Sequence, residues 1–236
     1  MTLRDAFARM TTAVFSAVVV VAALVGYSPT PGQYQWLNRG SVDNHVAVIG
    51  DSYTTGTDEG GRGPRSWTAQ TWHILAAQGL KVDADVVAEG GAGYSVRGTH
   101  GNVFEDLTVR AVKRDDVLVV FFGSRNDQPV DKQTYPVMVG ETFRIARRVA
   151  PSAKFLVIGP PWPTANPPAD VLALRDSLRN QAVAVGAVFI DPLVEGWFVG
   201  RPDLIGSDGV HPNDAGHAYL AAKIAPLIRN QLTIKV

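Results

Sequence analysis

Short apolar runs alternate along the chain with segments whose apolar residues recur at helical spacing. Runs of this kind are typical of strands buried in a parallel sheet, and they are found at 46–49, 82–88, 117–122, 154–158 and 187–190. Helical patterns lie between or after them, at 66–78, 134–149, 169–185 and 213–231. Strands separated by helices predict a three-layer α/β/α domain whose parallel sheet carries helices on both faces. We expect about five parallel strands in the order 2-1-3-4-5.

The N-terminal segment 1–27 differs from this pattern. Arg4 and Arg9 precede an apolar stretch, 13–25, that is interrupted only by Ser16. A basic head followed by about 7–15 apolar residues is typical of a secretory signal peptide. The longer stretch 11–27 approaches the length of a membrane-spanning helix, so a signal peptide and an uncleaved anchor both stay open. Either one predicts an extracytoplasmic location, secreted or membrane-anchored, with membrane contact through residues 11–27.

The remaining organisation follows from composition. Residues 28–44 are rich in Pro, Gly and polar residues and predict a linker. The remaining residues, 45–236, are long enough for one catalytic domain. Lys and Arg number 22, as do Asp and Glu, so no nucleic-acid partner is expected. The chain has no cysteine, which excludes thiolate ligands and cysteine nucleophiles. The histidines outside the candidate site, at 45, 73, 100 and 217, show no metal-ligand spacing, and we expect no metal or cofactor. The oligomeric state stays undetermined.

Candidate chemistry is concentrated in the loops that follow strands, where open parallel sheets bind their ligands. Ser52 follows the first strand, and Asp208 and His211 lie just before the last helix. A serine hydroxyl becomes a nucleophile when a base takes its proton, and His211 is the candidate base. Asp208, three residues earlier, is the candidate acceptor that orients the imidazole. A turn or a helix cap would also use such residues, but nucleophile, base and acceptor together favour acyl transfer.

Acyl transfer also needs donors for the negative charge that develops on the substrate oxygen. The candidates are the backbone N–H of Ser52, a glycine N–H from the loop 89–95, and the side-chain amide of Asn126 after the third strand. Arg125, beside it, has two interpretations: it binds an anionic substrate group, or it forms an ion pair that holds its loop. His217 in the last helix is expected to be a surface or packing residue.

Three of these loops resemble conserved blocks of the SGNH (GDSL-type) hydrolases, a family of serine esterases and lipases. Gly50-Asp51-Ser52-Tyr53 is similar to the first block, with tyrosine where leucine is more usual. The sequence 124–127, Ser-Arg-Asn-Asp, is similar to the Gly-x-Asn-Asp block, with serine in place of glycine. The sequence 208–212, Asp-Gly-Val-His-Pro, matches the Asp-x-x-His block. The resemblance covers roughly residues 45–230.

The remaining block of the family, Asn-x-x-x-x-Gly, is represented only loosely. Its glycine falls on Gly93, with Ala88 at the asparagine position and Gly91 as the rival glycine. The resemblance therefore implies an oxyanion hole of Ser52, Gly93 and Asn126, and a flavodoxin-like fold. It implies cleavage of O-acyl esters, on a small molecule or on a cell-envelope glycan or lipid. An O-acyltransferase of the same fold is the alternative, followed by a non-catalytic envelope-binding module.

Overall fold

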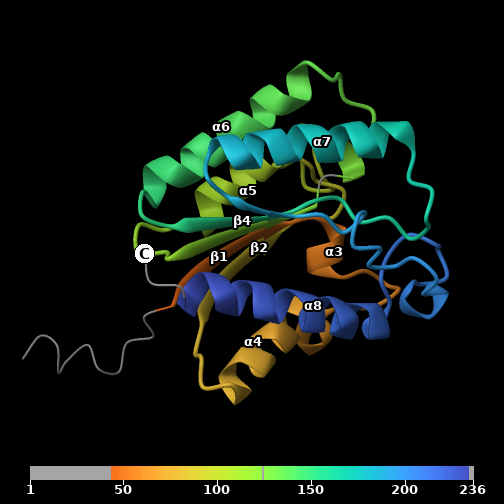
Figure 1. The fold of residues 1–236 in the computed structure, drawn as a ribbon, viewed down its shortest axis with the longest axis horizontal. Helices are drawn as coiled ribbons and strands as arrows, with labels where there is room; N and C mark the ends of the chain where they lie inside the picture. The colour runs from red at the N-terminus through yellow and green to blue at the C-terminus, as the bar shows by residue number, and fades with distance from the viewer. Residues whose placement is uncertain (1–43, 124, 234–236) are drawn as a thin grey trace, which may run out of the picture. The chain divides into compact units, whose positions relative to one another are not determined.

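The computed structural model describes residues 44–123 and 125–233. Their centre is a parallel sheet of five strands in the order β2-β1-β3-β4-β5, which is the predicted order (Figure 1). The strands are β1 (His45–Gly50), β2 (Asp83–Ala88), β3 (Leu118–Phe122), β4 (Lys154–Ile158) and β5 (Val188–Ile190). β1 and β3 lie inside the sheet and are almost wholly buried, which explains their uninterrupted apolar sequences.

Each face of the sheet has its own apolar core, because successive strand residues point to opposite sides. Ala47, Ile49 and Phe121 pack with residues of α5 (Phe104–Ala111), α6 (Thr134–Val149) and α7 (Ala169–Ala184). Val48 and Val120 pack on the other face with residues of α4 (Trp67–Ala77) and α8 (Asp214–Thr233). Figure 1 shows the two helical layers above and below the sheet. The domain is therefore an α/β/α sandwich of the flavodoxin-like type, as predicted.

Two helix caps follow from local sequence, whereas one helix was not predicted. The Ser66 side chain accepts the Ala69 N–H at the start of α4, and the Asn213 side chain accepts the Gly216 N–H at the start of α8. Helix α5 was not predicted from the sequence. It has only eight residues, and its signal is limited to apolar positions on one face, such as Phe104, Leu107 and Ala111.

The strand order brings the candidate loops together. Gly50, the last residue of β1, pairs with Ala88 of β2 on one side and Phe122 of β3 on the other. The loops that follow these three strands therefore leave the sheet side by side. β1 and β3 also flank the point where the strand order reverses, which is where open α/β sheets form their ligand crevice.

The predicted signal or anchor at 1–27, and the linker apart from Asn44, lie outside the described residues. Within 44–123 and 125–233, no helix has the length and apolar character needed to cross a bilayer.

Candidate active site

Ser52 begins the short helix α3 (Ser52–Thr55) directly after β1. The turn is tight at Gly50, where a Cβ atom would lie 2.1 Å from Oγ1 of Thr54. Asp51 caps the helix, because its Oδ1 accepts the Tyr53 N–H at 2.9 Å. The Ser52 N–H is at the helix N-terminus, where backbone N–H groups have no acceptor within the helix. The local sequence thus places the hydroxyl and the backbone N–H of Ser52 at the edge of the sheet where the strands have their carboxyl ends.

His211 is held by a turn that Asp208 organises. One carboxylate oxygen of Asp208, Oδ1, accepts the backbone N–H of Val210 at 2.8 Å and that of His211 at 2.9 Å. The other, Oδ2, lies 2.5 Å from the ring nitrogen Nδ1 of His211. Gly209 has φ +69°, a left-handed conformation that glycine adopts without strain. The three-residue spacing therefore lets one carboxylate fix both the backbone and the ring of His211.

Folding brings the histidine to the serine across 159 residues of sequence, with Nε2 of His211 3.0 Å from Oγ of Ser52. When Nδ1 donates to Asp208, the neutral ring keeps its lone pair on Nε2, which faces the hydroxyl. Partial desolvation raises the pKa of Asp208, but hydrogen bonds from His211 and the neighbouring backbone outweigh it and lower the pKa to about 2. Asp208 is therefore ionised at neutral pH and acts only as an acceptor.

Two of the candidate oxyanion donors, Asn126 and Gly93, have other partners in the structure. Nδ2 of Asn126 donates to the Ala92 carbonyl at 2.9 Å and lies 3.4 Å from Oδ2 of Asp51. The Gly93 N–H donates to the carbonyl of Val96 at 2.9 Å. An oxyanion role for Gly93 therefore requires that this N–H exchange Val96 for the substrate. The rival, Gly91, has φ +77° in the turn before Gly93.

Asp127 has a supporting role that the sequence analysis did not identify. Its carboxylate is buried and accepts three successive backbone N–H groups, those of Tyr94, Ser95 and Val96, each at 2.9 Å. Burial raises the pKa of Asp127, while these three donors act to lower it. The residue thus joins the loop after β3 to the loop after β2, and it fixes Asn126 beside the glycine-rich segment. An acidic residue following Asn126 was the only sequence signal.

Asp51 and His217 are two further buried titratable groups near the site. Complete burial raises the pKa of Asp51 to about 6, although the Tyr53 N–H and the charge of Arg125 act to lower it. His217 is a packing residue: it is 1% exposed, and its Nδ1 accepts the Trp67 N–H at 3.3 Å. Burial lowers the pKa of His217 to about 4. Neither side chain belongs to the Ser52–His211–Asp208 array.

Arg125 takes part in none of the ion pairs found among residues 44–123 and 125–233. Its guanidinium instead lies over the ring of Trp162, 4.7 Å from the centroid, and donates to the hydroxyl of Tyr53 at 3.4 Å. The partners of Arg125 in the described part of the chain are therefore an aromatic ring and a hydroxyl, and its ion-pair interpretation stays a prediction. Its other interpretation, binding of an anionic substrate group, also stays a prediction.

The loop at 56–66 is hydrogen-bonded to the segment just before Asp208. The Glu59 carboxylate accepts the backbone N–H of Ser207 at 2.5 Å and its hydroxyl at 2.9 Å.

No group of three or more His, Cys, Asp or Glu side chains among the described residues is arranged to hold a metal ion. The site itself consists of the Ser52 hydroxyl, the His211 ring and the Asp208 carboxylate in hydrogen-bonded series, with amide donors nearby.

Comparisons with known proteins show the family of the chain and agree with its fold. Residues 48–219 match the GDSL-like Lipase/Acylhydrolase family. The chain is 60% identical over 224 residues to the GDSL lipase Rv0518 of Mycobacterium tuberculosis, covering 94% of this chain and 97% of that protein. These matches define the class of protein: a hydrolase of the kind that acts on esters. The chain belongs to the GDSL-like lipase/acylhydrolase family, the GDSL or SGNH hydrolases.

Solved structures share the fold at low sequence identity. A lipase/acylhydrolase from Enterococcus faecalis superposes with a TM-score of 0.62 at 19% identity, over 80% of this chain and 96% of that one. A family two carbohydrate esterase from Clostridium thermocellum, in complex with cellohexaose, superposes with a TM-score of 0.64 at 18% identity. That match covers 81% of this chain and 65% of the esterase.

Proposed function

We propose that the chain hydrolyses O-acyl carboxylic esters through an acyl-enzyme on Ser52. The observation that carries this proposal is the hydrogen-bonded series itself: Ser52 Oγ lies 3.0 Å from His211 Nε2, and His211 Nδ1 lies 2.5 Å from Asp208. A nucleophile, a base and an orienting acceptor within hydrogen-bond reach are the arrangement that serine-dependent acyl transfer requires.

In this proposal each group has its own step. Oγ of Ser52 attacks the ester carbonyl carbon while Nε2 of His211 takes the hydroxyl proton. The tetrahedral intermediate collapses, the C–O bond to the alcohol breaks, and His211 returns the proton to the leaving oxygen. Water then attacks the acyl-enzyme by the same route, releasing the acid and restoring the Ser52 hydroxyl. Asp208 stays ionised and stabilises the imidazolium in both halves.

The oxyanion of each intermediate needs donors aimed at the substrate oxygen. We assign this role to the backbone N–H of Ser52 and the amide of Asn126, with Gly93 as the third donor. Asn126 is supported by its contact with Asp51, which places its amide beside the serine turn. For Gly93 the support is the family resemblance alone, because its N–H donates to Val96 in the structure.

The substrate that we propose is an ester on a cell-envelope glycan or lipid. Two observations support it: the basic and apolar segment 1–27, which favours export, and the lipase and carbohydrate esterase named among the similar proteins. Fractionation of cells that express the tagged full chain, with N-terminal sequencing of the product, tests export and cleavage. Recovery of the intact chain in the cytoplasm would contradict this part of the proposal.

The chemical step is tested with a short-chain p-nitrophenyl ester and an active-serine probe such as a fluorophosphonate. We expect the full chain to turn over the ester in the presence of chelators and to be labelled at Ser52, and Ser52→Ala to lose both properties. Ser152→Ala, which changes an exposed serine in the turn before β4, is the matched control. Equal turnover with and without the Ser52 hydroxyl would overturn the proposal. Transfer of the acyl group to an added glycan in preference to water would identify an acyltransferase instead.

A further inference from the structure

Tyr53 follows the proposed nucleophile at a position where this family more usually carries leucine. Its side chain is fully buried, yet its hydroxyl reaches across 157 residues of sequence and donates to the carbonyl of Val210 at 2.5 Å. A leucine at this position would be apolar and buried as well, but it would leave that carbonyl without this donor. The Tyr53 hydroxyl therefore supplies a hydrogen bond that packing of an apolar side chain would not supply.

The carbonyl that Tyr53 binds belongs to the peptide group immediately before His211. The N–H of the same peptide group donates to Oδ1 of Asp208 at 2.9 Å. A peptide group is planar, so partners on its C=O and its N–H together fix its orientation. Tyr53 and Asp208 thus clamp the two ends of the plane from which the His211 side chain projects.

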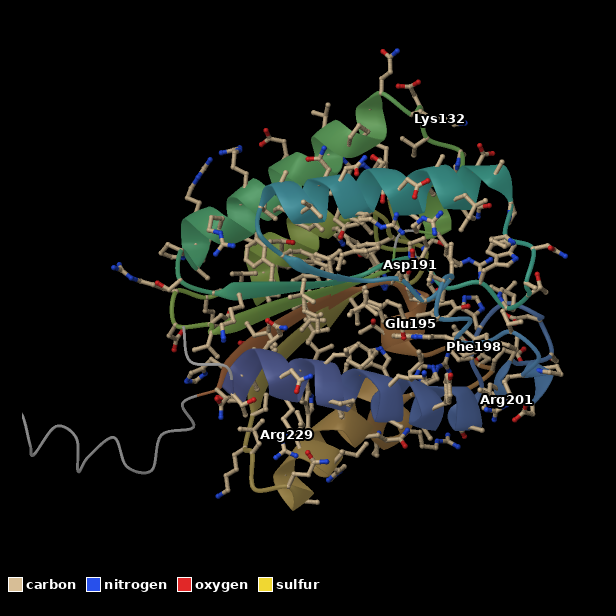
Figure 2. All side chains as sticks on the ribbon, in the orientation of Figure 1. Lys132, Asp191, Glu195, Phe198, Arg201 and Arg229 are labelled. Atoms are coloured by element: carbon tan, nitrogen blue, oxygen red, sulfur yellow. The ribbon has the colours of Figure 1, made fainter. Side chains whose placement is uncertain are left out.

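The Tyr53 ring is packed among other aromatic rings. It makes edge contacts with Phe122 and Phe198, with ring centroids 6.1 and 6.3 Å apart, and its centroid lies 6.0 Å from that of the His211 ring. Phe198 lies on the segment between β5 and α8 (Figure 2). The hydroxyl also accepts a hydrogen bond from Nη1 of Arg125 at 3.4 Å. Burial raises the pKa of Tyr53 to about 12, so the hydroxyl keeps its proton and remains a donor.

We propose that Tyr53 is a positioning residue, whose hydroxyl sets the His211 backbone so that Nε2 meets the Ser52 hydroxyl. This inference rests on the proposed function, because it assigns a role within the same Ser52–His211–Asp208 array. Tyr53 acts through the Val210–His211 peptide group. Loss of the hydroxyl is therefore expected to lower kcat and to leave KM nearly unchanged.

The test compares Tyr53→Phe with the wild-type full chain on a p-nitrophenyl ester. The variant keeps the ring and removes only the hydroxyl, and we expect kcat to fall roughly 5- to 50-fold with KM within about twofold. Thr142→Val is the matched control, since it removes a buried hydroxyl that donates to the Met138 carbonyl in α6. We expect wild-type kcat from this control. Tyr53→Leu, which restores the more usual residue, is expected to be at least as slow as Tyr53→Phe.

A second measurement separates the positioning role from general loss of stability and from the proposed chemistry. The proton between His211 Nδ1 and Asp208 is expected to give a far-downfield NMR signal because the two atoms lie 2.5 Å apart, and this signal can be followed in Ser52→Ala without any turnover. We expect the further change Tyr53→Phe to broaden this signal or speed its exchange, whereas Thr142→Val leaves it unchanged. A Tyr53→Phe variant with wild-type kcat and an unchanged signal would overturn the inference. Wild-type turnover by Ser52→Ala would overturn the proposed function and leave the NMR test of Tyr53 intact.

Discussion

A single carboxylate holds His211 at two points: Asp208 Oδ1 accepts the histidine N–H at 2.9 Å, and Oδ2 lies 2.5 Å from ring nitrogen Nδ1. Replacing Asp208 with asparagine removes the charge that stabilises an imidazolium and offers an amide that favours the wrong tautomer. We expect Asp208→Asn to lower kcat by about 10²- to 10⁴-fold. Steady-state kinetics on a p-nitrophenyl ester measures this effect.

The control for that change is Asp203→Asn, which removes an exposed carboxylate paired with Arg201. It is expected to leave kcat within about twofold, since exposed ion pairs contribute little to stability or structure. An Asp208→Asn enzyme that retains wild-type kcat would show that Asp208 does not orient the base.

Asp51 and His217 make opposite contributions to the pH dependence of stability over the same range. The pKa of Asp51 rises from 3.8 to about 6 on folding, so its contribution to the free energy of unfolding is greatest below about pH 4 and is lost as pH rises to 6. The pKa of His217 falls from 6.5 to about 4, so its contribution is present above pH 6.5 and is lost as pH falls to 4. Each shift corresponds to about 3 kcal/mol, and the two largely offset each other.

Variants separate these two contributions. Relative to the wild type, Asp51→Asn is expected to gain about 3 kcal/mol in the free energy of unfolding between pH 4 and pH 6.5. His217→Asn, which keeps an acceptor for the Trp67 N–H, is expected to lose a similar amount over the same interval. Urea unfolding at several pH values measures both slopes. Differences from the wild type that do not vary with pH would contradict the assignment.

Asp127 is expected to control the geometry of the loop that carries Gly93. Asparagine at position 127 offers one acceptor oxygen where the carboxylate offers two, and its amide hydrogens face N–H groups. We therefore expect Asp127→Asn to lower the free energy of unfolding by about 2–4 kcal/mol and to reduce kcat as well. Chemical unfolding and ester kinetics measure the two effects.

Asp131→Asn is the control for Asp127, because Asp131 also accepts backbone N–H groups, at Gln133 and Thr134, but in an exposed turn. It is expected to cost no more than about 1 kcal/mol and to leave kcat unchanged. Equal losses of stability in the two variants would argue against a special role for the buried carboxylate.

Local sequence was sufficient for most of the fold. The apolar runs at 46–49 and 117–122 predicted buried strands because β1 and β3 are covered on both faces, so no polar residue interrupts them. Ser66 and Asn213 predicted helix starts because a side-chain cap acts within three residues. Helix α5 was not predicted because eight residues give too short a pattern. A helix of this length also depends on packing against the rest of the protein for its stability.

The candidate site divides in the same way. Ser52, Asp208 and His211 could be named as candidates from the sequence because turn residues after strands and a three-residue spacing are local features. The partners of Tyr53 and Asp127 were not, because these side chains act on backbone groups 157 and 31–33 residues away. The sequence by itself determined where the buried strands lie and which candidate residues follow them in the loops. Only the tertiary structure decided which backbone groups hold them, since a buried polar side chain takes its partner from whatever loop folding brings beside it.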